Sequence, residues 1–209
     1  MPVVTVAQQK GGAGKTTLVI QLATAFRAGG VRVALVDIDP QASLSGWMKR
    51  REHRPQPAPD LRLSMVGGWR LGVEVDRLKR DADLIIVDTP PHAATEAKGA
   101  VRAADLVLIP CQPSPLDVWA SAATVELAKR EGRPVAFVLN RVPPRARSID
   151  EALAAIRELG AGTLESHLCN RQAFVAAVGQ GLGAVESEPK GAAADEARRL
   201  ADEVVRRLG

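Results

Sequence analysis

A glycine-rich segment near the start of the chain has the composition of a phosphate-binding loop. It follows an apolar run that predicts a strand and precedes a stretch that predicts a helix. Glycines let backbone N–H groups approach phosphates with no Cβ in the way. Lys15 would neutralise the β- and γ-phosphates, Thr16 would offer its hydroxyl to Mg²⁺, and Thr17 would lie near the α-phosphate. The segment therefore predicts a nucleotide site formed by Lys10, Gly11, Gly12, Ala13, Gly14, Lys15, Thr16 and Thr17.

Three aspartates end apolar runs that predict strands. Asp37 and Asp39 end one run, and Asp88 ends the run Leu84–Asp88. Acids beside phosphates would repel them unless metal or water lies between, so we expect these groups to act on Mg²⁺, its waters or an attacking water. An apolar strand that ends in Asp downstream of a phosphate loop predicts that Asp88 holds Mg²⁺. We expect a metal site of Thr16, Asp37 and Asp88, with capping of the strand end as the alternative for Asp37.

Asn140 ends another predicted strand. Its amide offers both a donor and an acceptor, which matches the edge of an adenine base. The alternative is an ordinary turn residue at the end of a strand, and the two interpretations stay open.

Short apolar runs alternate with longer helical patterns along the chain. The predicted strands are Val3–Ala7, Val31–Asp37, Leu84–Asp88, Leu106–Pro110 and Val135–Asn140. The predicted helices are Thr16–Ala28, Val73–Arg80, Leu116–Arg130, Ile149–Leu159 and Asp195–Leu208. This order predicts an α/β fold with a doubly wound, mostly parallel sheet flanked by helices. The proline-rich segment His53–Asp60 is too short to separate domains, so we expect a single domain over residues 1–209.

The composition limits the class of protein. Aromatic residues make up only 3% of the chain, so the core must consist mainly of Val, Leu, Ile and Ala. The net charge of +4 permits a basic face for nucleic acid without requiring one. Cys111 and Cys169 stand far apart, which predicts reduced thiols. The sequence has neither a signal-peptide pattern nor an apolar run of membrane-spanning length, and we expect a cytoplasmic protein.

Two segments together carry a family resemblance. Lys10–Thr17, followed by Val36–Gln41, resembles the ParA/MinD family of deviant Walker A ATPases, P-loop NTPases of the SIMIBI type. The match is closest to short ParA-type partition ATPases such as ParF. It implies that Lys10 reaches across a dimer to the partner's ATP and that Asp39 positions the hydrolytic water. It also implies that Asn140 contacts the base. The catalytic residues would then be Lys10, Lys15 and Asp39, with a solvated loop lysine as the alternative for Lys10.

The resemblance also implies partners. It implies an ATPase that uses ATP and Mg²⁺, forms an ATP-dependent homodimer and binds DNA non-specifically in association with the nucleoid. A cargo adaptor or a centromere-binding protein would stimulate hydrolysis, and the cargo would be a plasmid, a chromosome or a protein cluster. Phosphate contacts need only positive charge. The candidate DNA contacts are Arg141, Arg145, Arg147, Arg171, Lys190, Arg198 and Arg199, and for each one a solvated surface residue is the alternative.

A MinD-like protein that cycles on membranes is the other function that the resemblance allows. It would need a C-terminal amphipathic helix with bulky apolar residues that enter lipid. The stretch Asp195–Leu208 offers Ala, Val and Leu but no Phe or Trp, and it carries several acids. We therefore expect this helix to pack on the core and expect no stable membrane insertion.

Overall fold

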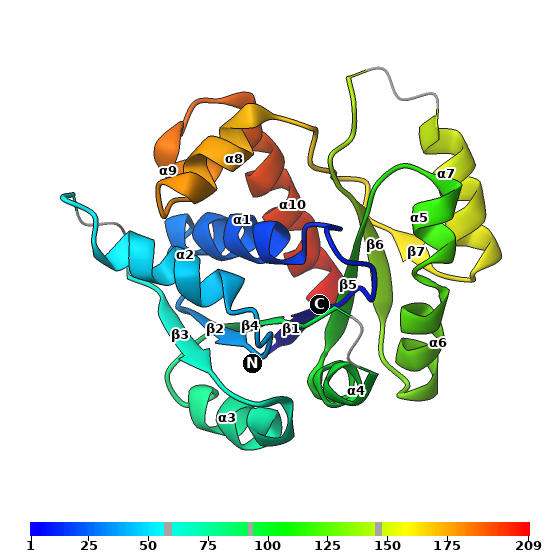
Figure 1. Ribbon diagram of the computed structural model, residues 1–209, viewed down its shortest axis with the longest axis horizontal. Coiled ribbons are helices and arrows are strands. Elements are labelled where there is room, and N and C mark those ends of the chain that lie inside the picture. Colours follow the sequence, from blue (N-terminus) through cyan, green and yellow to red (C-terminus); the bar gives the residue numbers. More distant parts are fainter. Residues whose placement is uncertain (57–59, 92–93, 145–147) are drawn as a thin grey trace.

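The computed structural model describes residues 1–56, 60–91, 94–144 and 148–209. Its centre is a sheet of seven parallel strands in the order β3-β2-β4-β1-β5-β6-β7 (Figure 1). The strands are β1 Val3–Val6, β2 Val33–Asp37, β3 Arg62–Met65, β4 Leu84–Asp88, β5 Leu106–Cys111, β6 Val135–Leu139 and β7 Gly162–Thr163. The prediction of a doubly wound parallel α/β fold is confirmed.

Helices cover both faces of the sheet (Figure 1). The helices on one face pack against a cluster of buried apolar residues that includes Leu35 and Ile86. The helices on the other face pack against two such clusters, one of which includes Val36 and Ile85. Side chains of neighbouring strand residues thus point to opposite faces, as in any strand. The first layer comprises α1 Lys15–Ala28, α2 Ser43–Glu52, α8 Gln172–Gly179, α9 Ala184–Ser187 and α10 Ala192–Leu208. The second comprises α3 Leu71–Leu78, α4 Ala94–Ala103, α5 Pro115–Trp119, α6 Ala122–Arg130 and α7 Ser148–Glu158, with the short 3-10 helix η1 Gly68–Arg70 before α3.

The sheet and α1 hold the most deeply buried part of the core. Every residue of β1, β2, β4 and β5 is buried, and ten residues of α1 are buried as well. A parallel sheet covered on both faces requires such continuous apolar strands. Because parallel strands all end at one edge, the loops after β1, β2 and β4 converge there. The strand order reverses at β1, because β4 and β2 lie on one side of it and β5 and β6 on the other. Open α/β sheets bind ligands at the carboxyl ends of the strands beside such a reversal.

The structure differs from the predicted elements in three respects. Leu116–Arg130 is not one helix but α5 and α6, separated at Ala120 and Ser121. The buried Ser121 hydroxyl donates to the Asp117 carbonyl and accepts from the Gln8 amide, so this turn is fixed by the strand-end loop beside it. The edge strands β3 and β7 and the helices α2, α4, α8 and α9 were not predicted.

Candidate functional site

The loop between β1 and α1 is shaped to receive phosphate. Gly12 and Gly14 have φ angles of 76° and 91°, in the left-handed region that favours glycine. A Cβ at Gly14 would lie 2.3 Å from the Asn140 amide nitrogen, whereas nothing lies within 4 Å of a Cβ built at Gly11 or Gly12. The outer side of the loop is therefore open, and the N-terminus of α1 points its N–H groups toward it.

Lys15 lies under this loop with its ammonium group turned to the strand end. The side chain is buried, and Nζ donates to the Gln8 carbonyl at 3.1 Å. Burial lowers the pKa of Lys15, and the carboxylates of Asp88 and Asp39 oppose that shift. A buried ammonium with a single carbonyl partner can still donate to phosphate oxygens.

Thr16 and Asp88 form the contact expected of a Mg²⁺ site. The Thr16 hydroxyl donates to Asp88 Oδ2 at 2.7 Å, and Oδ1 is buried without a partner among the described residues. Burial raises the pKa of Asp88 to about 7. An orphaned carboxylate oxygen beside a hydroxyl fits a hard divalent cation, which would favour the ionised form. No cluster of three His, Cys, Asp or Glu able to hold a metal occurs in the described parts of the chain, so the remaining ligands would be phosphate oxygens and water.

Asp37 and Asp39 lie after β2 but use their carboxylates differently. Asp37 is fully buried; Oδ1 accepts from the Asp39 N–H, and Oδ2 accepts from the Ser45 N–H and hydroxyl. This bonding ties α2 to the end of β2 and favours a positioning role over direct metal contact. Asp39 accepts only the Gln41 N–H, through Oδ1, among the described residues. Burial raises the pKa of Asp37.

Lys10 is engaged within its own subunit. Its Nζ lies 2.7 Å from Asp117 Oδ1 at the start of α5, and 42% of the Lys10 side chain is exposed. Gln8, two residues before Lys10, fixes the start of the loop. Its backbone carbonyl accepts from Lys15 Nζ, and its side-chain amide donates to the Ser121 hydroxyl. The sequence analysis did not identify Gln8 or Asp117. A Gln between a strand and a phosphate loop is too common a pattern to single out, and Asp117 is distant in sequence.

Asn140 supports the loop from beneath. Its Nδ2 donates to the Ala13 carbonyl at 3.0 Å, and its Oδ1 accepts the Arg141 N–H at 2.9 Å. The side chain is only 4% exposed. These bonds give Asn140 a structural role, and contact with a base stays a prediction.

The glycine-rich loop and the segments that follow β2 and β4 surround a cavity of about 220 Å³. Its lining includes the open glycines, Lys15 and Thr16 from the loop, Asp39 from the end of β2, and Pro91 after β4. The geometry therefore joins the segments after four strands, β1, β2, β4 and β6, around a place for a phosphate chain. Residues 4–185 match the family model of the CobQ/CobB/MinD/ParA nucleotide binding domain.

The chain belongs to this family. It is 36% identical to the maintenance of carboxysome distribution protein A of Gloeobacter kilaueensis, over 98% of this chain and 94% of that protein. It is 34% identical to Protein ParA of Rhizobium radiobacter, over 84% of this chain and 82% of the relative. The structure of the cell division ATPase MinD of Pyrococcus furiosus matches with a TM-score of 0.83 at 21% identity, covering 99% of each chain, and at that identity the likeness concerns the fold alone. The resemblance to ParA-type proteins is confirmed.

For this ParA-type chain, the structure separates the candidate DNA contacts. Arg171 Nη2 lies 2.7 Å from the buried Glu196 carboxylate, and Arg198 bonds Asp195 and the Pro189 carbonyl. Arg171 thus joins the start of α8 to α10, whereas Arg198 is bonded within α10 and to the segment before it. Lys190 and Arg199 are exposed, and no described residue pairs with them. Arg141 lies at the phosphate cavity instead, and Arg145 and Arg147 fall outside the described residues.

The C-terminal helix α10 packs on α1. Small and branched apolar residues make up most of its buried face. Among its large hydrophobic residues only Val205 is exposed, with an exposed fraction of 54%. No helix among the described residues is long and apolar enough to cross a membrane. The buried apolar residues of α10 are Ala193, Ala194, Ala197, Leu200, Ala201 and Val204, and Glu196 and Glu203 of the same helix are buried as well. This packing agrees with the expectation that the helix belongs to the core.

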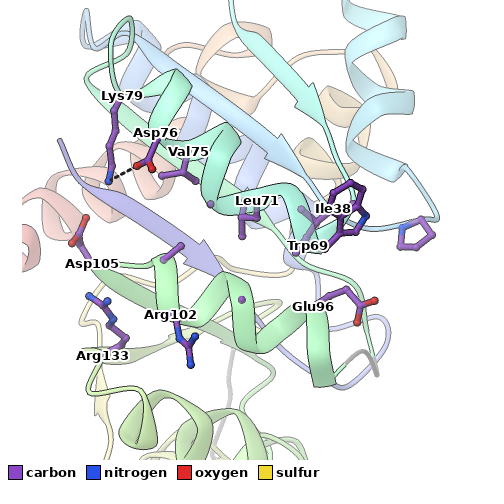
Figure 2. A pocket seen from close by; sticks show the side chains of 16 residues that line it. Ile38, Trp69, Leu71, Val75, Asp76, Lys79, Glu96, Arg102, Asp105 and Arg133 are labelled. Atoms are coloured by element: carbon purple, nitrogen blue, oxygen red, sulfur yellow. Dashed lines mark ion pairs between the residues drawn. The ribbon is translucent and has the colours of Figure 1, made fainter.

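A larger cavity, of about 750 Å³, lies between α3 and α4 (Figure 2). Ile38 and Trp69 line one end, and Asp105 and Arg133 line the other. Its basic side chains are matched by acids, and it contains no residue of the glycine-rich loop. We therefore assign nucleotide binding to the smaller cavity, because of the residues that line it. Ile38 and Pro40, which flank Asp39, line the larger cavity, so the two cavities share the loop after β2.

Proposed function

We propose that this protein is a ParA-type ATPase that binds Mg-ATP and forms an ATP-bound homodimer. The dimer binds DNA without sequence preference and positions a cargo. A partner protein stimulates hydrolysis, and hydrolysis returns the dimer to monomers that leave DNA. The cell location that this cycle implies is the cytoplasm, in association with the nucleoid.

The observation that carries the proposal is the cavity lined by the glycine-rich loop, Thr16 and Asp39, with Asp88 bonded to Thr16 behind its wall. Phosphoryl transfer needs little covalent chemistry from a protein and depends on positioning and charge stabilisation. The backbone N–H groups of the loop and Lys15 bind the phosphates. Thr16 and Asp88 would hold Mg²⁺, which would neutralise negative charge on the phosphates.

The remaining residues supply orientation. Asp39 orients the attacking water, since its Oδ2 has no partner among the described residues and its Oδ1 is held by the Gln41 N–H. Asp37 fixes that loop through Ser45. Lys10 lies at the mouth of the loop, where a second subunit would meet it, and its present partner Asp117 is a carboxylate that it would exchange for phosphate.

The cargo is proposed from the relatives. One relative is named for carboxysome distribution and another is a ParA protein, so the cargo is a protein assembly or a DNA molecule. The packed α10 gives no support to membrane cycling, and the likeness to MinD concerns the fold alone.

The test combines nucleotide, DNA and lipid binding. Wild-type protein should bind ATP with Mg²⁺ by calorimetry, release phosphate, and shift DNA of unrelated sequences only with ATP. Lys15→Ala should lose nucleotide binding and, with it, the DNA shift, because the main cation under the phosphates is gone. Co-sedimentation with anionic vesicles serves as the contrasting arm. Vesicle binding without a DNA shift would favour a MinD-like cycle, and ATP affinity retained in Lys15→Ala would overturn the site.

A further inference from the structure

Two non-glycine residues among those described have left-handed backbones, and both lie beside the phosphate site. Ala42 has a φ of 53°, and Arg141 has a φ of 52°. Ala42 precedes α2 in the loop after Asp39, and Arg141 directly follows Asn140. This conformation is unfavourable for residues with a Cβ and persists where the surroundings impose it. Strain gathered at one site is a reason to look for a function there.

The backbone of Arg141 is held by the residue that supports the phosphate loop. Its N–H donates to Asn140 Oδ1, and the same amide donates through Nδ2 to the Ala13 carbonyl. Asn140 is buried, so this link is shielded from water. The position of Arg141 is therefore fixed relative to the loop rather than left to a flexible turn.

The guanidinium of Arg141 is available for an anion. The residue is exposed and lines the 220 Å³ cavity beside Gly14 and Thr17. No described residue forms an ion pair with it, in contrast to the paired Arg171 and Arg198. Lys15 is the other basic residue in the lining, and Asp39 contributes a negative charge to it. A phosphate chain placed there would carry more negative charge than Lys15 alone can balance.

We infer that Arg141 binds the phosphates of the nucleotide held in its own subunit and is not a DNA contact. A guanidinium is suited to this task because its planar donors match phosphate oxygens in pairs. The left-handed backbone is held at the cavity by Asn140, which also bonds the loop, and the bound nucleotide would supply the counter-charge. The inference rests on the proposed nucleotide binding but not on DNA binding or dimerisation.

Arg141→Gly and Arg141→Asn provide the test, because both residues tolerate a positive φ while removing the guanidinium. We expect the affinity for Mg-ATP to fall by about tenfold or more in calorimetry, as for loss of a hydrogen bond to a charged group. Without nucleotide, the thermal midpoint of Arg141→Gly should equal or exceed that of wild type, because the backbone strain is relieved. Arg141→Lys keeps charge without the planar fork, and its affinity should be intermediate.

Arg80→Ala is the matched control, since it removes an exposed arginine whose side chain has no partner among the described residues. Its nucleotide affinity should equal that of wild type. Comparing ATP with GTP locates the contact: equal fold-losses for both in Arg141→Gly indicate phosphate, and a loss for ATP alone would overturn the phosphate assignment in favour of the base.

The outcomes separate this inference from the proposed function. Wild-type protein that binds no nucleotide would refute both. Wild-type binding with unchanged affinity in both Arg141→Gly and Arg141→Asn would refute the inference alone. If those variants kept nucleotide affinity but lost the DNA shift at saturating ATP, Arg141 would be the DNA contact that its charge first suggested.

Discussion

Asp39 is the acidic side chain of the phosphate cavity with an oxygen left for water. Both oxygens of Asp37 accept hydrogen bonds from the Asp39 N–H and from Ser45, and Asp88 bonds Thr16 through Oδ2 while its buried Oδ1 is left for a metal ion. The three aspartates at neighbouring strand ends are thus not interchangeable, because their hydrogen-bond partners assign them different tasks. Substitutions at these positions should fail in different ways.

Asp39→Ala should keep nucleotide affinity and lose turnover. The change leaves the glycine-rich loop, Lys15 and Asp88 intact and removes only the group that orients water. We expect phosphate release to fall by about 100-fold or more, the range for loss of a positioned acid or base. Calorimetry with ATP is the control measurement. Phosphate release within a fewfold of wild type would show that Asp39 has another role.

In the proposed dimer, Lys10 would exchange its pair with Asp117 for the phosphates of the partner subunit's ATP, so the two interactions would compete. The Asp117 pair at 2.7 Å is partly exposed and therefore weak, worth about 1 kcal/mol or less. Asp117→Asn should release Lys10 and shift the ATP-dependent dimer to a severalfold lower protein concentration in light scattering with a non-hydrolysable ATP analogue. Lys10→Ala should bind ATP but stay monomeric.

The two variants check each other. Asp117→Asn keeps the size of the side chain, so loss of packing does not explain an effect on dimers. If Lys10→Ala dimerises and hydrolyses ATP like wild type, Lys10 is a solvated loop lysine and the chain is an ordinary P-loop NTPase. If Asp117→Asn leaves the dimer unchanged, the pair does not restrain Lys10.

The residue types of the site could be predicted from sequence, but their bonding could not. The glycine-rich loop and the strand-end aspartates have local patterns with a physical meaning. The link from Lys10 to Asp117 joins residues 107 positions apart, and the left-handed backbone of Arg141 depends on the Asn140 amide. Such contacts arise only on folding. The sequence analysis therefore assigned Arg141 and Arg171 to DNA from their charge and the family resemblance, and the structure gives both a different setting.

At the scale of elements, Glu196 links α10 to the start of α8 and to the segment that precedes α8. Its carboxylate accepts from the Cys169 N–H at 2.9 Å and from Arg171, the residue that precedes α8. Burial acts to raise the pKa of Glu196, but the bonds from Arg171 and Cys169 outweigh it, and the pKa lies below its usual value. A carboxylate with a lowered folded-state pKa stabilises the fold above its unfolded-state pKa and loses that contribution as pH falls through the folded value.

Glu196→Gln should therefore destabilise the protein by about 1–3 kcal/mol at pH 7, as for loss of hydrogen bonds to a charged group. The difference from wild type should shrink as pH falls below the ordinary glutamate pKa of 4.5. Urea unfolding at pH 7 and at acidic pH measures it. Asp202→Asn, an exposed acid on the same helix, is the control and should differ little from wild type at either pH. A pH-independent deficit in Glu196→Gln would show that packing rather than charge is lost.

Elements buried in the centre of the sheet were the predictable ones. β4 has the predicted bounds, and β1, β2, β5 and β6 differ from prediction by at most two residues at either end. β3 was missed because an edge strand with an exposed Arg62 and Met65 lacks the continuous apolar character of its neighbours. The division between α5 and α6 was missed because helical spacing of apolar residues continues through it, and a tertiary contact of Ser121 decides the turn.

At the scale of the whole molecule, the distribution of unpaired basic side chains bears on DNA binding. The formal charge of +4 is modest, and much of the arginine content is used in ion pairs within the chain. Lys190 and Arg199 are exposed and unpaired among the described residues, and both lie in the C-terminal part that packs over α1. A dimer would present both residues twice on one assembly, and binding should therefore require two copies held together by ATP.

DNA affinity should depend on ATP, fall steeply with salt and be independent of sequence, because each phosphate contact releases counterions. If each copy of Arg199 contacts one phosphate, Arg199→Ala should reduce the slope of log K against log salt by about 2 for the dimer, at roughly 0.9 per phosphate. Lys190→Ala should reduce the slope in the same way.

Arg80→Ala, which removes an exposed arginine beyond α3 on the other face of the sheet, is the charge-matched control and should leave the slope unchanged. Lys10→Ala should bind DNA weakly at every salt concentration, since it stays monomeric. An equal change in slope for Arg80 and Arg199 variants would indicate a diffuse charge effect, and a preferred DNA sequence would contradict a surface that reads only phosphate.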